Sequence, residues 1–392
     1  MSRFDDLISE LCPDGVRFRA LADVLGYEQP GKYLVQSTSY DDRCTTPVLT
    51  AGQTFILGYT DELDGVYPAS PENPVIIFDD FTTAFKWVDF PFKAKSSAMK
   101  MLTPKSSGLV SLRYAYYAMQ TIRYAPQDHA RQWIGIYSQF RIPIPPAEVQ
   151  REIVRVLDLF TSLDAELRAE LDARRLQFAH CRDALMTFTE DGQASWATLG
   201  ELGEFIRGRR FTKDDYVDSG MGCIHYGQIY TDYGTTATKT ITFLPEDLRS
   251  KLRLARPGDL VIAATGENVE DVCKAVAWLG DDEVAVHDDC YIYRHVLNPT
   301  YASYLFQTSG FQEQKVRYVS ESKVVRISGA SMAKVRVQVP PLEAQERIVT
   351  VLNSFDALVN DLSSGLPAEI AARRTQYEYY RDRLLTFAEL AA

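Results

Sequence analysis

The sequence of 392 residues lacks several features that define common protein classes. It has no apolar run of about eighteen residues, which argues against a membrane-spanning helix. Its first residues, MSRFDDLISELC, lack the basic and then apolar order of a secretory signal. We therefore expect a cytoplasmic protein. The six cysteines are scattered with no CxxC pair, so the sequence predicts neither a zinc site nor a disulfide framework.

The chain also lacks an excess of positive charge. Its net charge of -11 argues against a protein that coats nucleic acid along its whole surface. Local basic clusters are present nonetheless. From Ala84 to Ala125 there are seven basic residues against Asp89 alone: Lys86, Lys93, Lys95, Lys100, Lys105, Arg113 and Arg123. A second set comprises Arg207, Arg209, Arg210, Lys213, Lys239, Lys315, Arg317, Lys323 and Arg326. Either set could be an ordinary solvated surface.

Motifs of catalysis are absent or incomplete. The stretch GYEQPGKY has the spacing of a phosphate loop, but Tyr33 follows Lys32 where Ser or Thr would hold magnesium. There is no GxGxxG loop, and Asn73-Pro74-Val75 falls short of an NPPY-type methyltransferase motif. His287, Asp288, Asp289 and Cys290 are adjacent, but we expect them in one alternating strand with a structural role. We predict no catalytic residues and no metal ligands.

The most informative pattern is an internal repeat. Residues 145 to 160, PPAEVQREIVRVLDLF, match residues 340 to 355, PPLEAQERIVTVLNSF, at an offset of 195. The similarity returns at residues 173 to 188 and 372 to 387 with an offset of 199, so the second copy is four residues longer. The extra residues lie near SSGLP at 363–367, which predicts a kink or break there.

Both copies have the apolar spacing of a long amphipathic helix, with steps of three, four or seven residues. One such helix alone would most often pack on its own domain. Two matched helices predict instead an antiparallel pair related by an approximate two-fold axis. We expect their contact stripe, which we call the seam, to include Phe160, Leu163, Leu167, Phe178, Phe355, Leu358, Leu362 and Tyr377.

A segment of mixed β and α character precedes each helix, and the two segments differ much more than the helices do. The predicted fold class is α+β, with two mixed α/β globules alternating with two long helices. We place the first globule at 1–144, the first helix at 145–190, the second globule at 191–339 and the second helix at 340–392.

Taken together, these features resemble the specificity subunit of Type I restriction-modification systems. The resemblance covers nearly the whole chain. It rests on the twin PPxxxQ helices, on the ending LPAEIAARRTQYEYYRDRLLTF, and on the stretches PENPVIIFDDFTTAFKWVDFPFKAKSSAMKML and LGELGEFIRGRRFTKDDYVDSGMGCIHYGQIYTDYG.

The resemblance implies a non-catalytic subunit with two target-recognition domains, each reading one half of a bipartite double-stranded DNA target. It implies that the paired helices set the spacing and dock two modification subunits. Those partners would bind S-adenosylmethionine, and restriction subunits would use ATP and magnesium, so no cofactor is expected in this chain. Because the two helices differ by four residues, a spacer length does not follow from them.

Charge, polarity and predicted loops indicate the residues for DNA contact, because cations position phosphates and neutral donors read base edges. In the first globule they are Tyr59, Thr60, Thr82, Thr83, Lys86, Lys93, Lys95, Ser96 and Ser97. In the second they are Arg209, Arg210, Lys213, Tyr226, Gln228, Tyr230, Lys239, Asn268, Ser322 and Lys323. The rival hypotheses are a protein scaffold without DNA readout and, less favoured, a nucleotide hydrolase or fused methyltransferase.

Overall fold

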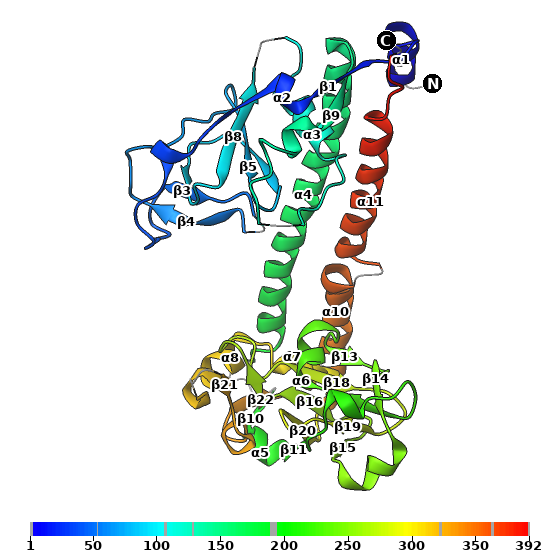
Figure 1. The fold of residues 1–392 in the computed structure, drawn as a ribbon. Coiled ribbons are helices and arrows are strands. Elements are labelled where there is room, and N and C mark those ends of the chain that lie inside the picture. The colour runs from blue at the N-terminus through cyan, green and yellow to red at the C-terminus, as the bar shows by residue number, and fades with distance from the viewer. Residues whose placement is uncertain are drawn as a thin grey trace. The chain divides into compact units, whose positions relative to one another are not determined.

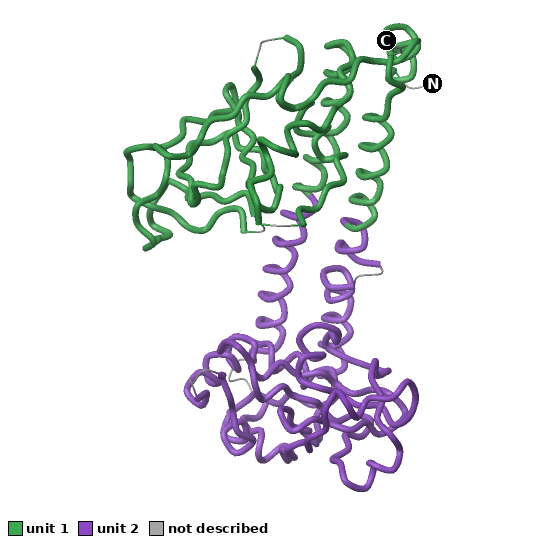
Figure 2. The backbone as a smooth tube through the Cα atoms, in the orientation of Figure 1, with its two compact units in different colours: residues 1–166, 371–392 green, residues 167–370 purple. Residues whose placement is uncertain are grey.

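The computed structural model describes residues 3–52, 54–105, 108–127, 129–188, 194–320, 324–361 and 364–390. It divides into two compact units, coloured in Figure 2. Unit 1 holds residues 1–166 and 371–392, and unit 2 holds residues 167–370. None of the helices in the described ranges is long and apolar enough to cross a membrane.

Unit 1 is built on an antiparallel sheet with the order β2-β8-β5-β6. Its strands are β2 (Leu25–Glu28), β8 (Met99–Pro104), β5 (Val75–Asp79) and β6 (Phe85–Val88). A smaller sheet joins β4 (Ile56–Thr60), β3 (Thr46–Leu49) and β7 (Lys93–Ala94), and β1 (Arg17–Ala20) pairs with β9 (Arg141–Ile144). The helices α1 (Arg3–Leu11), α2 (Leu21–Val24) and α3 (Leu112–Met119) complete the unit. Strand β5 is buried along both faces, which explains its uninterrupted apolar sequence.

Unit 2 repeats this plan with more strands. Its main sheet has the order β11 (Gly203–Arg207), β20 (Cys290–His295), β16 (Leu260–Ala263), β18 (Ala275–Trp278) and β13 (Thr236–Ala237). A second sheet has the order β14 (Thr242–Leu244), β12 (Met221–Ile224), β19 (Val284–Val286) and β15 (Leu254–Ala255). Two further pairs are β10 (Ser195–Thr198) with β22 (Arg336–Val339), and β17 (Thr265–Gly266) with β21 (Val325–Arg326). The short helices are α5 (Leu199–Leu202), α6 (Tyr226–Thr231), α7 (Pro299–Leu305), α8 (Ser309–Lys315) and α9 (Gly329–Met332).

The glutamine of each PPxxxQ motif fastens the long helix to the short helix before it. Gln150 is buried; its side-chain oxygen accepts from the backbone N–H of Ser111, 3.0 Å away, and its amide donates to two carbonyls. Gln345 likewise accepts from the N–H of Asn298 at 2.8 Å. Ser111 and Asn298 are the N-caps of α3 and α7, whose backbone N–H groups lack a partner inside the helix. In both units a buried glutamine amide therefore joins the start of the long helix to the N-cap of the preceding short helix; we call this junction the corner.

A second pair of equivalent hydrogen bonds holds the same helices together further along. Tyr117 of α3 donates its hydroxyl hydrogen to Asp158 at 2.5 Å, and Tyr304 of α7 donates to Asn353 at 2.9 Å. The acceptors are 195 residues apart, as the sequence repeat requires. The duplication thus extends from the long helices into the globules, where the sequences themselves match poorly.

The long helices are α4 (Ala147–Leu185), α10 (Leu342–Asn360) and α11 (Leu366–Leu384) (Figure 1). In unit 1, Phe160 of α4 packs its ring against Tyr377 and Tyr380 of α11. Ile153, nearer the start of α4, clusters with Leu384 at the end of α11, so the two helices run antiparallel. The predicted α+β class with its antiparallel helices is confirmed.

In unit 2 the remainder of α4 shares a buried cluster with α10. This cluster includes Leu171 and Phe178 of α4 with Leu352 and Val359 of α10, and Phe355 packs against it. Leu163 and Leu167 are half-buried, as seam residues in a two-helix contact would be.

One predicted seam residue is wrong. Leu358 is 42% exposed, and its neighbour Val359 is fully buried in its place. Leu362 lies outside the described residues. Helix α10 ends at Asn360 and α11 begins at Leu366, so the apolar stripe is not continuous there. For position 358 the reason lies within α10: a step of three residues from Phe355 predicts Leu358, whereas the buried stripe continues four residues on, at Val359.

We expect Phe355→Asp to destabilise unit 2, and Phe160→Asp unit 1, by at least about 2 kcal/mol each, because both would place a charge in an apolar contact. Leu358→Asp is the matched control, since its side chain is exposed and the change should cost less than about 0.5 kcal/mol. Urea unfolding of the three variants measures the free energies. Equal losses for Phe355→Asp and Leu358→Asp would contradict the seam described here.

We also expect Gln345→Ala, and independently Gln150→Ala, to cost about 1–3 kcal/mol, because each leaves buried N–H and C=O groups without partners. Gln177→Ala removes an exposed glutamine from α4 and should change stability by less than about 0.5 kcal/mol. Denaturant unfolding monitored by circular dichroism compares the three. A cost near zero for Gln345→Ala would show that the corner does not depend on its amide.

Candidate nucleic-acid interface

The main sheets of the two units end in equivalent sets of loops. In unit 1 the backbone N–H of Asp80 donates to the carbonyl of Ala98, and that of Gln132 donates to the carbonyl of Asp80. In unit 2 the N–H of Ala264 donates to the backbone carbonyl of Asp289, and that of Ile327 donates to the carbonyl of Ala264. We call these loops the loop edge of each unit. It comprises residues 79–84, 95–98 and 130–133 in unit 1, and residues 263–268, 286–289 and 325–328 in unit 2.

Five of the predicted DNA-contact residues of unit 1 lie on its loop edge: Thr82, Thr83, Lys95, Ser96 and Ser97. Thr82 is exposed, and the carboxylate of Asp79 fixes its turn by accepting from its N–H and its hydroxyl. Thr83 is buried and has a positive φ of 58°, so it shapes the turn and does not face solvent. The structure thus brings a short polar set together at one end of the sheet.

Lys93 does not belong to this surface. Its side chain is buried, its ammonium nitrogen lies 2.8 Å from a carboxylate oxygen of Glu62, and it donates to the carbonyl of Asp64. The hydrogen bond from Lys93 is the largest of the causes that lower the pKa of Glu62. Lys93 is therefore engaged inside the unit and is not available to a phosphate, contrary to the prediction.

The basic cluster of unit 1 is smaller than the sequence suggests. Lys100 and Asp80 are both fully buried and form an ion pair of 2.8 Å. Arg113 binds Asp158 and stacks on the ring of Trp87. These cations hold the unit together, because a buried charge needs a close partner.

The remaining predicted residues of unit 1 lie away from the loop edge. Tyr59 and Thr60 lie in β4, where Thr60 is buried and its hydroxyl accepts from the N–H of Glu62. Lys86 is half-buried in β6.

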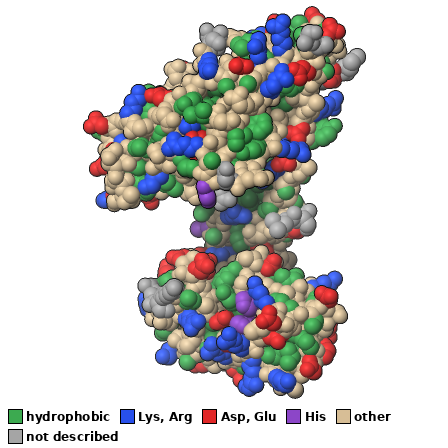
Figure 3. All heavy atoms as spheres, viewed as in Figure 1, with side chains coloured by type: hydrophobic (Ala, Val, Ile, Leu, Met, Phe, Trp, Pro, Cys, Tyr) green, Lys and Arg blue, Asp and Glu red, His purple; other side chains and the backbone are tan. Residues whose placement is uncertain are grey.

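In unit 2 the predicted basic contact residues that the structure describes follow β11 or lie in a loop. Arg210, Lys213 and Lys239 are exposed, and exposed Arg209 donates to the carbonyl of Lys251. Asn268 lies on the loop edge, is exposed, and exchanges hydrogen bonds with Asp271. Figure 3 shows Lys and Arg side chains gathered on the visible face of unit 2 next to histidines.

Three predicted contact residues in α6 have structural tasks. Gln228 accepts from the N–H of His225 and donates to Thr242, so it caps the helix. Tyr230 donates its hydroxyl hydrogen to the carbonyl of Thr265, and burial raises the hydroxyl pKa well above its usual value. Tyr226 is half-buried beside the rings of His225 and Tyr230. Ser322 and Lys323 lie outside the described residues.

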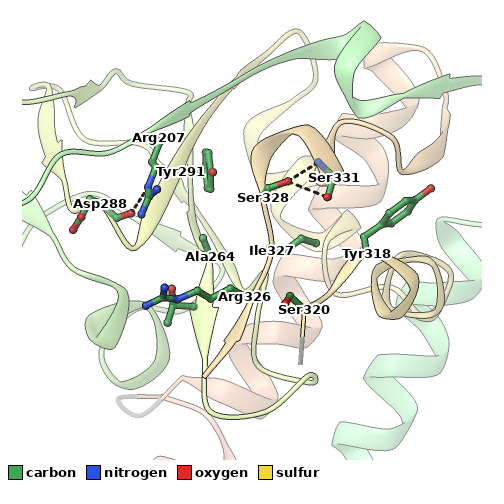
Figure 4. Close-up of a pocket in the computed structure, with 11 residues that line it drawn as sticks. Arg207, Ala264, Asp288, Tyr291, Tyr318, Ser320, Arg326, Ile327, Ser328 and Ser331 are labelled. Carbon is green, nitrogen blue, oxygen red and sulfur yellow. Dashed lines mark hydrogen bonds between the residues drawn. The ribbon is translucent and has the colours of Figure 1, made fainter. Parts of the chain in front are cut away.

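Two basic residues of unit 2 are exposed but are not among the predicted DNA contacts: Arg326 on the loop edge and Arg207 at the end of β11. Arg207 and Arg326 line a pocket of about 340 Å³, drawn in Figure 4. In unit 1 the residue at the position of Arg326 is Arg131, which is also exposed; the offset of 195 pairs them. The same offset, continued upstream from the PPxxxQ motif, is the signal in the sequence that could have indicated that Arg131 and Arg326 occupy equivalent positions.

The residues around His287 differ from their predicted arrangement. Strand β19 ends at Val286 and β20 begins at Cys290, so His287, Asp288 and Asp289 form a turn and not one strand. Their ligand atoms lie within 4.8 Å of one another. Nε2 of His287 is 3.1 Å from the carbonyl of Phe211, and Nδ1 accepts from the N–H of Asp289. Both ring nitrogens are used by the backbone, which supports a structural role.

The phosphate-loop-like stretch does not form a nucleotide cradle. Residues Gly31–Tyr33 form a single 3-10 turn, and Lys32 lies 2.8 Å from Glu28. Hydrogen bonding to Glu28 raises the pKa of Lys32 to about 12. A phosphate-binding loop instead leads from a strand into a long helix.

Comparisons with known proteins agree with this architecture. The family profile described as "Type I restriction modification DNA specificity domain" matches residues 195–372. The chain is 40% identical to the EcoR124I/EcoR124II specificity subunit of Escherichia coli over 390 residues, covering 95% of this chain and 94% of the other. A solved structure titled for complex assembly and conformational transition of the type I R-M system matches with a TM-score of 0.59 at 15% identity, covering 96% and 98% of the two chains. The Type-I S subunit from M. genitalium matches with a TM-score of 0.50 at 12% identity, covering 95% and 96%.

We expect Lys93→Ala to lower stability by about 3 kcal/mol, because Glu62 would lose its buried partner, and to leave the salt dependence of DNA binding unchanged. Arg210→Ala should do the opposite, reducing the slope of log K against log salt by about one unit at unchanged stability. Fluorescence anisotropy on duplex DNA at several salt concentrations, with thermal unfolding of the same samples, measures both. A reduced salt slope for Lys93→Ala would restore it as a phosphate contact.

Proposed function

The chain belongs to the specificity subunits of Type I restriction-modification enzymes, and we propose that its two loop edges are the surfaces that read the two halves of a split DNA target. The observation that carries this proposal is one backbone frame built twice with different side chains. Asp80 and Ala264 occupy the same place in that frame, as do Gln132 and Ile327. Two equivalent frames with different linings suit two different half-sites.

The side chains at the loop edges have the chemistry for base recognition. Thr82 and Ser97 in unit 1 and Asn268 and Arg326 in unit 2 are exposed donors or acceptors. In the major groove each base pair presents its own pattern of donors, acceptors and methyl groups, which hydroxyl, amide and guanidinium groups distinguish. The loops are anchored from behind by hydrogen bonds such as that from Tyr230 to Thr265, so their side chains are presented from a fixed backbone.

Cations on or beside the loop edges would position the DNA. In unit 2 these are Arg209, Arg210, Lys213 and Lys239, and in unit 1 Lys86 and Lys95 are the half-buried candidates. Contacts to phosphates fix the register of a protein on the duplex and carry no sequence information of their own. The net charge of -11 is compatible with this role, because attraction to DNA depends on the local distribution of charge.

The long helices would dock two modification subunits. Leu159, Leu176 and Tyr379 on these helices are 59%, 75% and 61% exposed, so they offer apolar surface that a docked subunit would cover. In this proposal S-adenosylmethionine binds to the modification subunits, and restriction subunits supply ATP-dependent cleavage with magnesium. The chain itself contributes recognition of the DNA target, and it would act in the cytoplasm, where the DNA lies.

The deciding experiment reconstitutes the chain with its modification subunit and S-adenosylmethionine, and then maps methylated adenines on genomic DNA by single-molecule sequencing. We expect a split motif with two defined halves and a fixed gap. A complex that assembles but methylates no defined motif would favour the rival scaffold, in which the exposed helix residues bind proteins and the globules do not read DNA.

A further inference from the structure

The end of the main sheet beside the loop edge is filled by side chains in unit 1 and contains a pocket in unit 2. Strand pairing sets Phe78 opposite Lys100 in unit 1, and the equivalent pair in unit 2 is Ile262 opposite Tyr291. The loop-edge hydrogen bonds place Asp80 of unit 1 and Ala264 of unit 2 at equivalent positions. Gln132 and Ile327 are equivalent in the same way, so the residues that follow them, Trp133 and Ser328, correspond as well. The two units can therefore be compared side chain by side chain at this place.

In unit 1 the space is occupied. Lys100 and Asp80 are fully buried as an ion pair, and Trp133 is 2% exposed with its backbone N–H donating to the Asp80 carboxylate. In unit 2 the corresponding residues are Tyr291, Ala264 and Ser328. Replacing Asp80 by alanine and Trp133 by serine removes the groups that would cover the sheet end, and the pocket of about 340 Å³ lies there.

Polar groups of both kinds line this pocket. In Figure 4, Arg207, Asp288 and Arg326 lie on one side, Ser328 and Ser331 lie on the other, and Ala264 and Ile327 are between them. Arg207 donates from Nε to the backbone carbonyl of Asp288, 2.9 Å away, and so fixes the turn that carries the carboxylate. The guanidinium of Arg326 is exposed and has no partner among the described residues.

One carboxylate oxygen of Asp288 lies 3.3 Å from Nε2 of His287, which leaves the second oxygen to accept from a ligand. A donor and an acceptor on one concave surface fit a base-pair edge better than a phosphate does. Guanine offers the acceptors O6 and N7, which a guanidinium contacts with two parallel hydrogen bonds, and cytosine offers its N4 amine to a carboxylate. A phosphate would bind the arginines but would be repelled by Asp288. Only Asp288 contributes a negative charge among the residues that line the pocket.

We propose that this pocket reads a G·C pair in the half-site recognised by unit 2, with Arg326 donating to guanine and Asp288 accepting from the cytosine amine. Arg207 is a positioning residue that holds the Asp288 turn. This inference rests on the proposed function and adds to it the identity of one base pair and of the two side chains that recognise it.

The test uses the complex of the full chain with its modification subunit, and a duplex library in which every position of the mapped target is randomised in turn. We expect Arg326→Ala to reduce discrimination about 10-fold or more at one G·C pair of one half-site. Asp288→Asn should reduce discrimination at the same pair. Arg326→Lys keeps the charge but loses the planar guanidinium fork, so it should reduce discrimination at that pair as well.

The matched control is Arg131→Ala, which removes the arginine at the equivalent place in unit 1. It should leave every position of the unit 2 half-site unchanged. Assembly with the modification subunit is measured first by size-exclusion chromatography, so that a misfolded variant is recognised and replaced by Arg326→Lys or Asp288→Asn.

Four results would overturn the inference: a unit 2 half-site without a G·C pair, unchanged discrimination in Arg326→Ala, uniform weakening at all sequences as for a phosphate contact, or relaxation at different pairs by Arg326→Ala and Asp288→Asn. Failure of the wild-type complex to show any split motif would instead refute the proposed function. The two failures are therefore separable.

Discussion

The hydrogen bonds of two buried glutamine side chains are the contacts on which this architecture depends. Gln150 and Gln345 sit in the first turn of α4 and α10, where each amide satisfies the N-cap N–H of the neighbouring short helix and carbonyls in the loop before its own helix. A buried amide left unpaired costs more than the paired one contributes, so these corners tolerate little movement. Each long helix consequently leaves its globule in a direction set by hydrogen bonds that both halves share.

What the halves share and what they do not share follow different physical rules. Tyr117 with Asp158 and Tyr304 with Asn353 make the same contact with an acid in one half and an amide in the other, so the frame requires an acceptor at that position and not a charge. The loop edges show the reverse. There the backbone hydrogen bonds are equivalent while the side chains range from an ion pair to a pocket. A frame held by backbone and buried amides leaves the sheet ends free to vary.

The sequence predicts the features that arise from local patterning. Helical periodicity and the proline-glutamine motif indicate α4, α10 and α11, and the duplication indicates the two-part organisation. Exposure of individual lysines is not a local property. Lys93 and Lys100 look identical to Lys86 in a list of charges, yet the first two are buried because Glu62 and Asp80, distant in sequence, lie beside them. The same limit applies to His287, whose turn is set by strand pairing on either side, and to Arg326, which belongs to the loop edge only through Ala264.

The contrast between the filled and the hollow sheet end shows how recognition can change without loss of the fold. Losing Lys100 or Asp80 alone would leave an uncompensated buried charge, which costs several kcal/mol. Losing both together, with Trp133 made small, removes the charges and opens the space, and the remaining frame still has its backbone hydrogen bonds. Unit 2 is in that state, with Tyr291, Ala264 and Ser328 at those places. Concerted exchange of three residues therefore converts a closed sheet end into a polar pocket, which single substitutions would reach only through an unstable intermediate.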